Sequence, residues 1–110
     1  MRRFEFLAEC GLVGWSELEG GDPPMGVAHG VLHPGEAYAR MPPGATVRVR
    51  APDGAYLEPS GGVWIEDHAA ELGPEGRVVH VLGLDSAVYQ AYFPQHSRRY
   101  WGGHGTPGAE

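Results

Sequence analysis

The chain contains no lysine: all eight of its basic residues are arginine, against fourteen Asp and Glu residues, and the formal net charge is -6. Binding of nucleic acid depends first on clusters of Lys and Arg that neutralise phosphates. The stretch from Asp53 to Glu75 instead carries six acids and no Lys or Arg. Because most of this sequence would repel a polyanion, we expect no nucleic-acid partner.

Cysteine is almost absent as well. The single thiol, Cys10, cannot form an internal disulfide, whereas small secreted domains usually depend on such bonds. The N-terminal residues lack the apolar core of a signal peptide, since Glu5 and Glu9 interrupt it. No segment has the apolar length needed to cross a bilayer. We therefore expect a cytoplasmic protein without a membrane partner.

The length of 110 residues suits one domain, and the 18 glycines and 10 prolines favour many turns between short elements. Because these residues interrupt helices at many positions, long helices are excluded. We expect a single globular domain over residues 1–101. Residues 102–110, where Gly, His and Pro accumulate, are expected to form a flexible tail. The sequence does not indicate an oligomeric state.

Alternation of apolar and polar residues predicts several short strands. We expect them at residues 3–9, 15–18 (strand or turn), 26–33, 45–51, 55–58, 63–69 and 77–84. A loop is expected at 19–24. In 26–33, Gly26, Ala28 and Gly30 share one face, which indicates close approach of another backbone or a ring. The apolar run in 77–84 predicts a central strand buried on both faces.

Two short helices are predicted beside these strands. One spans residues 35–41 after Pro34, and the other is capped by Asp85 or Ser86 and runs to Phe93. Parallel strands would need long crossover helices, which this pattern lacks. The sequence therefore predicts a strand-rich α+β fold: a small, mostly antiparallel sheet or partial barrel with a short C-terminal helix.

Motifs for catalysis and cofactor binding are missing. There is no G-x-S-x-G elbow and no phosphate-binding glycine loop, and Cys10 lies beside Glu9, where a thiolate is disfavoured. Asp67 and His68 are neighbours on a predicted strand and so point to opposite faces. We expect no cofactor, and we favour a protein that is not an enzyme.

The histidines offer an alternative hypothesis. On an extended strand the Cα atoms of His29 and His33 lie about 13 Å apart, too far to share one zinc ion unless Gly30 bends the strand. His80, on another strand, is a second candidate to approach His29. We favour sheet-face histidines without a metal. The alternative is a small enzyme or ligand-binding β-barrel whose His/aromatic-lined pocket contains His29 and His80.

Two arginines and two tryptophans complete the candidates. Arg48 and Arg50 share the exposed face of the 45–51 strand and have the chemistry to grip a carboxylate or an acidic loop of a partner. We favour the alternative, in which they pair with the protein's own acids, such as Glu58 or Glu66. Trp64 is expected in the core. Trp101, beside the Gly-rich tail, is the expected exposed interface anchor.

Together these features favour a non-catalytic acidic protein-binding domain, for example an inhibitor or immunity-type protein for a basic partner. The candidate binding residues lie in two acid-rich stretches, on the 45–51 strand and near the C-terminus. They are Glu5, Glu17, Glu19, Glu71, Glu75, Arg48, Arg50 and Trp101. The simpler explanation of the acids is that they keep the domain soluble.

Overall fold

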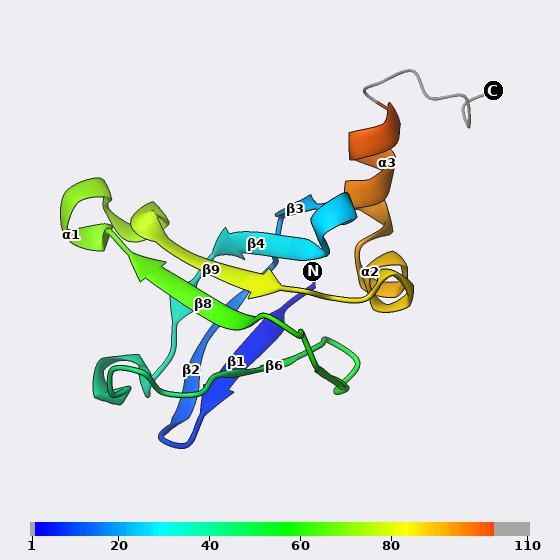
Figure 1. The fold of residues 1–110 in the computed structure, drawn as a ribbon. Helices are drawn as coiled ribbons and strands as arrows, with labels where there is room; N and C mark the ends of the chain where they lie inside the picture. The colour runs from blue at the N-terminus through cyan, green and yellow to red at the C-terminus, as the bar shows by residue number, and fades with distance from the viewer. Residues whose placement is uncertain (1, 103–110) are drawn as a thin grey trace.

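The computed structural model describes residues 2–102, in which nine strands form two antiparallel sheets (Figure 1). Sheet A has the strand order β5-β2-β1-β6-β7 and sheet B the order β3-β4-β9-β8. The strands of sheet A are β1 (Phe4–Ala8), β2 (Gly11–Ser16), β5 (His33–Pro34), β6 (Arg48–Arg50) and β7 (Tyr56–Leu57). Those of sheet B are β3 (Gly20–Asp22), β4 (Val27–Val31), β8 (Gly62–Asp67) and β9 (Arg77–Leu82).

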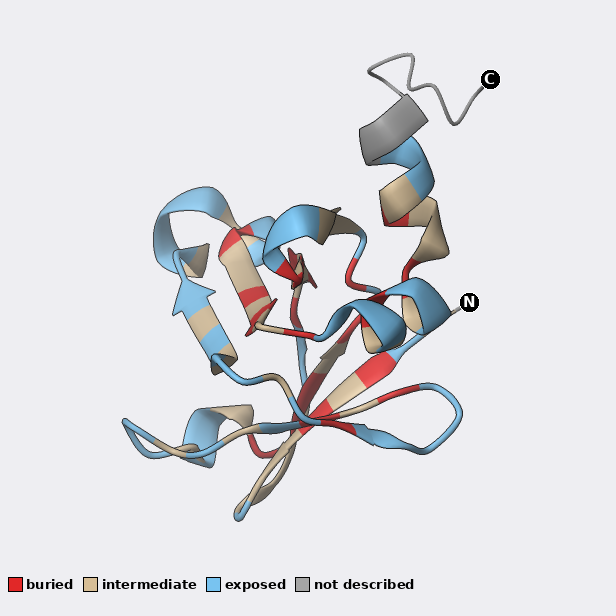
Figure 2. Cartoon of the chain, turned by 45° about the vertical axis from the view of Figure 1, so that its right-hand side comes forward, coloured by how far each residue is buried: buried red, intermediate tan, exposed pale blue. Residues whose placement is uncertain are grey.

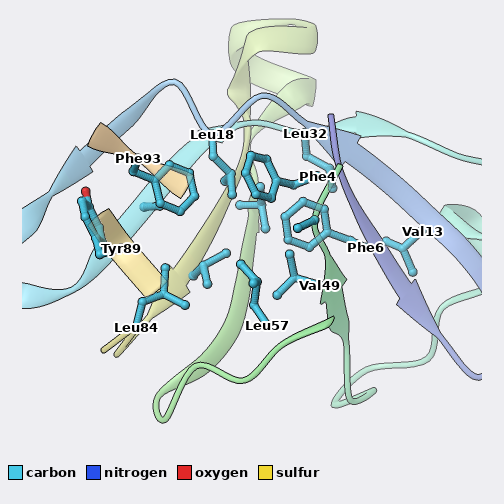
Figure 3. Close-up of a cluster of buried hydrophobic side chains, with 14 residues drawn as sticks. Phe4, Phe6, Val13, Leu18, Leu32, Val49, Leu57, Leu84, Tyr89 and Phe93 are labelled. Atoms are coloured by element: carbon cyan, nitrogen blue, oxygen red, sulfur yellow. The ribbon is translucent and has the colours of Figure 1, made fainter. Parts of the chain in front are cut away.

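The predicted strand-rich, antiparallel α+β fold is confirmed, although its strands divide between two sheets that do not close into a barrel within residues 2–102. Most strands alternate between buried and more exposed residues (Figure 2), so each sheet has one face to cover. Phe4, Phe6 and Val49 of sheet A (Figure 3) share one core with Val79 and Val81 of sheet B. The core thus lies between the sheets.

The predicted helix after β9 is confirmed as α2 (Ser86–Tyr92). The Asp85 carboxylate accepts a hydrogen bond from the Val88 amide at 2.9 Å, which caps the helix N-terminus. Tyr89 and Phe93 are buried, and the Phe93 ring stacks on Phe4 with centroids 5.1 Å apart. This aromatic stripe docks α2 at the end of the core.

A further helix, α3 (Pro94–Gly102), was not predicted. Pro94 follows the end of α2 and opens this new helix, because proline is favoured in the first turn. The buried His96 ring fixes α3, since its Nε2 lies 2.8 Å from the Leu18 carbonyl oxygen. A side chain at Gly21 would meet His96 Cδ2 at 2.8 Å, so only glycine lets α3 lie on β3. Residues 103–110 of the predicted tail lie outside the described residues.

The predicted helix over residues 35–41 is wrong. The amides of Gly35 and Ala37 donate to carbonyl oxygens of β2, at 2.7 and 3.0 Å, which holds the start of this segment against sheet A. Only the 3₁₀ turn η2 (Tyr38–Arg40) remains before Pro42. Further short helical turns are η1 (Pro23–Met25), α1 (Ala69–Leu72) and η3 (Pro74–Gly76).

Part of the predicted loop at 19–24 is strand β3, which pairs with β4 through its main chain. The close approach of another backbone predicted at Gly26 and Gly30 is confirmed. A side chain at Gly26 would lie 3.1 Å from the Leu84 amide nitrogen, and one at Gly30 would lie 2.9 Å from the Leu18 Cα atom. The predicted 45–51 strand shortens to β6. No helix within residues 2–102 has the length and apolar character required of a membrane span.

Two predictions about sheet B are wrong. β9 is central, but only Val79 and Val81 are fully buried, whereas His80 faces outward and is half-buried. Trp64 is not in the core: its exposed fraction is 63%. Because β8 turns its odd-numbered side chains toward sheet A, the Trp64 side chain is directed outward. Residues 2–102 therefore leave the outer face of sheet B uncovered.

Candidate protein-binding face

The outer face of sheet B is built from alternate residues of three neighbouring strands. The inward residues of β4 and β9 are buried, while the outward ones are half-buried. In Figure 1 these strands lie side by side, with α1 at one end and α2 at the other. We call the outward set the sheet B face; its residues are Val27, His29, Val31, Trp64, Glu66, Val78, His80 and Leu82.

A row of four residues, one from each strand of sheet B, crosses the middle of the sheet B face. The strand register places Gly20 opposite His29, His29 opposite His80, and His80 opposite Trp64. The two imidazole rings meet with centroids 5.9 Å apart. A side chain at Gly20 would lie 2.9 Å from His29 Nδ1, so glycine leaves room for the ring. An aromatic surface thus extends from β3 to the outer strand β8.

Glu66 joins this row from the side. Its Oε1 atom lies 3.0 Å from His80 Nε2, with about half of the Glu66 side chain exposed. The sequence did not reveal this pair, because Glu66 reaches His80 only through the β8–β9 register, in which it sits opposite Val78. Among the described residues no group of three His, Cys, Asp or Glu side chains is placed to hold a metal ion.

The predicted pocket residues His29 and His80 lie on this open sheet face. Neither histidine lines any of four hollows on the surface of the described residues. The largest lies between the β1–β2 hairpin and the segment before β6, with Cys10, Arg48 and Tyr56 in its wall. The two histidines thus lie outside these four hollows.

The predicted acidic residues flank sheet B at its connections. Glu17 and Glu19 lie between β2 and β3, while Glu71 and Glu75 lie between β8 and β9. All four are exposed. The Glu19 carboxylate accepts a hydrogen bond from the Val31 amide at 3.0 Å and so extends the edge of β4. The side chains of the other three make no hydrogen bond within the described residues.

Glu5 belongs to a different surface from these acids. It lies on sheet A directly opposite Arg50, which donates from Nε to the Glu5 carboxylate at 3.0 Å. Arg48 lies over the Tyr56 ring, 3.9 Å from its centroid. Both arginines are therefore engaged by groups of sheet A, and their partners are Glu5 and Tyr56 instead of the predicted Glu58 or Glu66.

Two further acids of the Asp53–Glu75 stretch have structural partners. Asp67 accepts from the Tyr38 hydroxyl at 2.7 Å and from Arg77 at 3.2 Å, and the Tyr38 hydrogen bond lowers the pKa of Asp67 most. Asp53 accepts from the Ala55 amide, which lowers its pKa. These two carboxylates stabilise loops through internal hydrogen bonds, so they are less available to a partner protein than the carboxylates of Glu17, Glu71 and Glu75. The side chain of the last candidate, Trp101, lies outside the described residues.

Comparisons of the chain with family models, curated proteins and solved structures give no match.

Proposed function

We propose that this chain is a non-catalytic binding domain that docks onto a basic partner protein through the sheet B face and the acids flanking it. An inhibitor or immunity-type protein is one concrete form of this function. The proposal rests on the contrast between this uncovered face and the buried core, and on the sign of the surrounding charge.

The observation that carries the proposal is the exposure of Trp64 at 63% on a sheet face that also presents valines and Leu82. Large aromatic side chains are the most frequent anchors of protein interfaces, and contiguous exposed apolar patches mark interaction sites. Trp64 contributes little to the core, so its burial by a partner would gain apolar contact that the isolated domain lacks.

The flanking acids define the charge of the partner. Glu17, Glu71 and Glu75 carry no internal counter-charge among the described residues, and the net charge of the chain, -6, has the same sign. Exposed charges of this kind change the rate of association more than the rate of dissociation. At about 0.1 M ionic strength, salt screens their interactions beyond about 10 Å. A basic partner would thus be steered toward sheet B.

The first experiment is affinity capture from the native lysate at low and high salt, followed by stopped-flow association with the recovered partner. The test variant is Glu71→Arg with Glu75→Arg. The control is Glu9→Arg with Glu36→Arg, which makes the same charge change at exposed sites away from sheet B. We expect the test pair to slow association about tenfold at low salt and the control to slow it much less.

Association that is indifferent to salt and to both pairs of reversals would contradict the proposal, and the acids would then serve solubility. The Glu66–His80 pair would in that case favour the alternative, a small enzyme or ligand-binding protein that uses His29 and His80. Thermal unfolding of both double variants should remain close to that of the parent, since exposed substitutions are usually near neutral in stability.

A further inference from the structure

Within the part of the chain that the structure describes, β8, the outer strand of sheet B, has one unpaired edge. β8 pairs with β9 on one side and ends the strand order on the other. The His68 amide donates to the Gly76 carbonyl at 2.9 Å, which makes this pair a hydrogen-bonded one. Hydrogen-bonded and non-hydrogen-bonded pairs alternate along an antiparallel ladder. The main-chain groups of Val63, Ile65 and Asp67 consequently point away from β9.

The neighbouring chain segment does not complete this edge. Residues 41–47 run beside β8, but Pro42 and Pro43 have no amide hydrogen to donate. The structure has no backbone hydrogen bond between this segment and β8. Instead a hollow of about 510 Å³ lies between them. Met41 and Val47 line one side of it, and Val63, Trp64 and Ile65 of β8 line the other.

We infer that the free edge of β8 binds an extended, basic segment of the partner by adding it to sheet B as a fifth strand. Strand addition satisfies exposed main-chain donors and acceptors, and side-chain sites on alternate positions supply the specificity. This inference rests on the proposed function, of which it gives the binding mode.

The two sides of β8 define the sequence that such a segment needs. Side chains on its inner side would enter the apolar hollow beside Val63 and Ile65. Side chains on its outer side would lie beside Trp64 and Glu66, an exposed indole next to a carboxylate. Arginine suits the outer positions, because its guanidinium both stacks on an indole and pairs with a carboxylate. The segment therefore alternates apolar and basic residues.

A second copy of this chain is the less suitable occupant. Edge-to-edge pairing would bring two molecules of net charge -6 together, with Glu66 and Asp67 on both of the joined edges. A basic segment instead meets those carboxylates with the opposite charge. Charge complementarity thus selects the partner over self-association.

The test uses a synthetic peptide of three Arg-Val repeats with blocked ends, titrated into the isotope-labelled protein. We expect hydrogen exchange of the Val63, Ile65 and Asp67 amides to slow at saturation. The same peptide with all of its backbone amides methylated has equal charge, but neither of its edges can pair with a strand. It should bind at least about tenfold more weakly, because it loses the main-chain hydrogen bonds.

The matching protein variant is Ile65→Pro, which removes an outward amide while sparing the bonds to β9. Its control, Ile65→Ala, shortens the side chain but keeps the amide. We expect the proline variant to bind the peptide at least about tenfold more weakly than the alanine variant. Circular dichroism checks that both are folded, and the methylated peptide tests the same point on the unaltered protein.

Equal binding of the methylated peptide, or unchanged exchange at the three amides, would overturn the inference. A dimer that forms at rising concentration and is lost in Ile65→Pro would also overturn it, with a second copy as the occupant. The two proposals fail separately with the captured partner. If charge reversal slows its association but Ile65→Pro has no effect, the proposed function stands without strand addition; the opposite result removes the basic-partner function alone.

Discussion

The outer faces of the two sheets use aromatic and charged side chains in opposite ways. On sheet A, the Arg3 guanidinium lies 3.8 Å from the Trp15 ring centroid, and His33 stacks on Trp15 with centroids 4.1 Å apart. Glu5 and Arg50 face each other in the same sheet. The charges and rings of sheet A are therefore matched within the face.

On sheet B, Trp64 has no cation stacked on it among the described residues, and the acids at the strand connections lack basic partners there. Its histidines pair with each other and with one carboxylate. A self-matched face gains little from a partner, because binding would break contacts already made. The unmatched face gains apolar burial and charge neutralisation together, which is why we assign the interface to sheet B.

The largest effect that separates the two faces concerns their tryptophans. We expect Trp15→Ala to lower the free energy of unfolding by about 2 kcal/mol, because the half-buried ring loses both packing and its cation–π contact. Trp64→Ala should change it by no more than about 0.5 kcal/mol, since the exposed indole packs little. Urea unfolding of the two variants gives both values.

The same variants should have the reverse order in binding. Loss of an aromatic anchor typically costs about 2 kcal/mol or more of binding free energy, so Trp64→Ala should lower the affinity for the captured partner about thirtyfold. Trp15→Ala should leave this affinity nearly unchanged. Equal losses of stability in the two variants would remove the distinction between the faces.

The second comparison is between a buried and an exposed histidine, His96 and His68. We expect the stability of the core beneath β3 to depend on pH through His96. The buried His96 ring donates from Nε2 to the Leu18 carbonyl, and its Nδ1 has no partner within the described residues. Burial lowers the pKa of His96 below its ordinary value of about 6.5, and the nearby Arg99, His29 and Arg2 act in the same direction.

The unfolded chain therefore binds a proton at His96 at higher pH than the folded chain does. Stability from this residue is complete above pH 6.5 and is lost as pH falls from there through the lowered pKa. His96→Gln keeps an N–H donor for Leu18 and should flatten this dependence in urea unfolding between pH 7.5 and 5. His68→Gln, at an exposed site, is the control and should retain the slope of the parent.

The elements predicted correctly from the sequence are those whose signal is local. Strand alternation placed β1, β4 and β8, an apolar run placed β9, and a capping carboxylate at Asp85 placed α2. The elements missed depend on distant main chain. β3 forms because β4 supplies its hydrogen bonds, and residues 35–41 are held by carbonyl groups of β2. The secondary-structure propensity of those two segments contains no information about the strands, β4 and β2, that supply their hydrogen bonds.

The candidate site was predictable in part for the same reason. The exposed acids at 17, 19, 71 and 75 follow from composition, whereas the row of His29, His80 and Trp64 follows from strand register, which pairs residues far apart in sequence. The wrong prediction for Trp64 shows that strand alternation outweighs side-chain size in deciding which residues are buried. Its bulk suggested the core, but alternation with Val63 and Ile65 directed it outward, and alternation prevailed.

The smallest expected effect compares two single acids that differ only in their surroundings. Glu5→Gln and Glu71→Gln each remove one negative charge, but Glu5 is already paired with Arg50, whereas Glu71 has no counter-charge among the described residues. We expect Glu71→Gln to slow association with the basic partner at low salt. Glu5→Gln should slow it less, because the field of a close ion pair is largely cancelled at the distance of an approaching protein.

Stability should change in the opposite order for these two variants. Glu5→Gln removes a salt bridge that is partly exposed, so its unfolding midpoint should fall slightly and the difference should shrink as salt rises. Glu71→Gln should leave the midpoint unchanged. If Glu5→Gln slowed association as much as Glu71→Gln, sheet A would also face the partner, and the assignment of the interface to sheet B alone would be wrong.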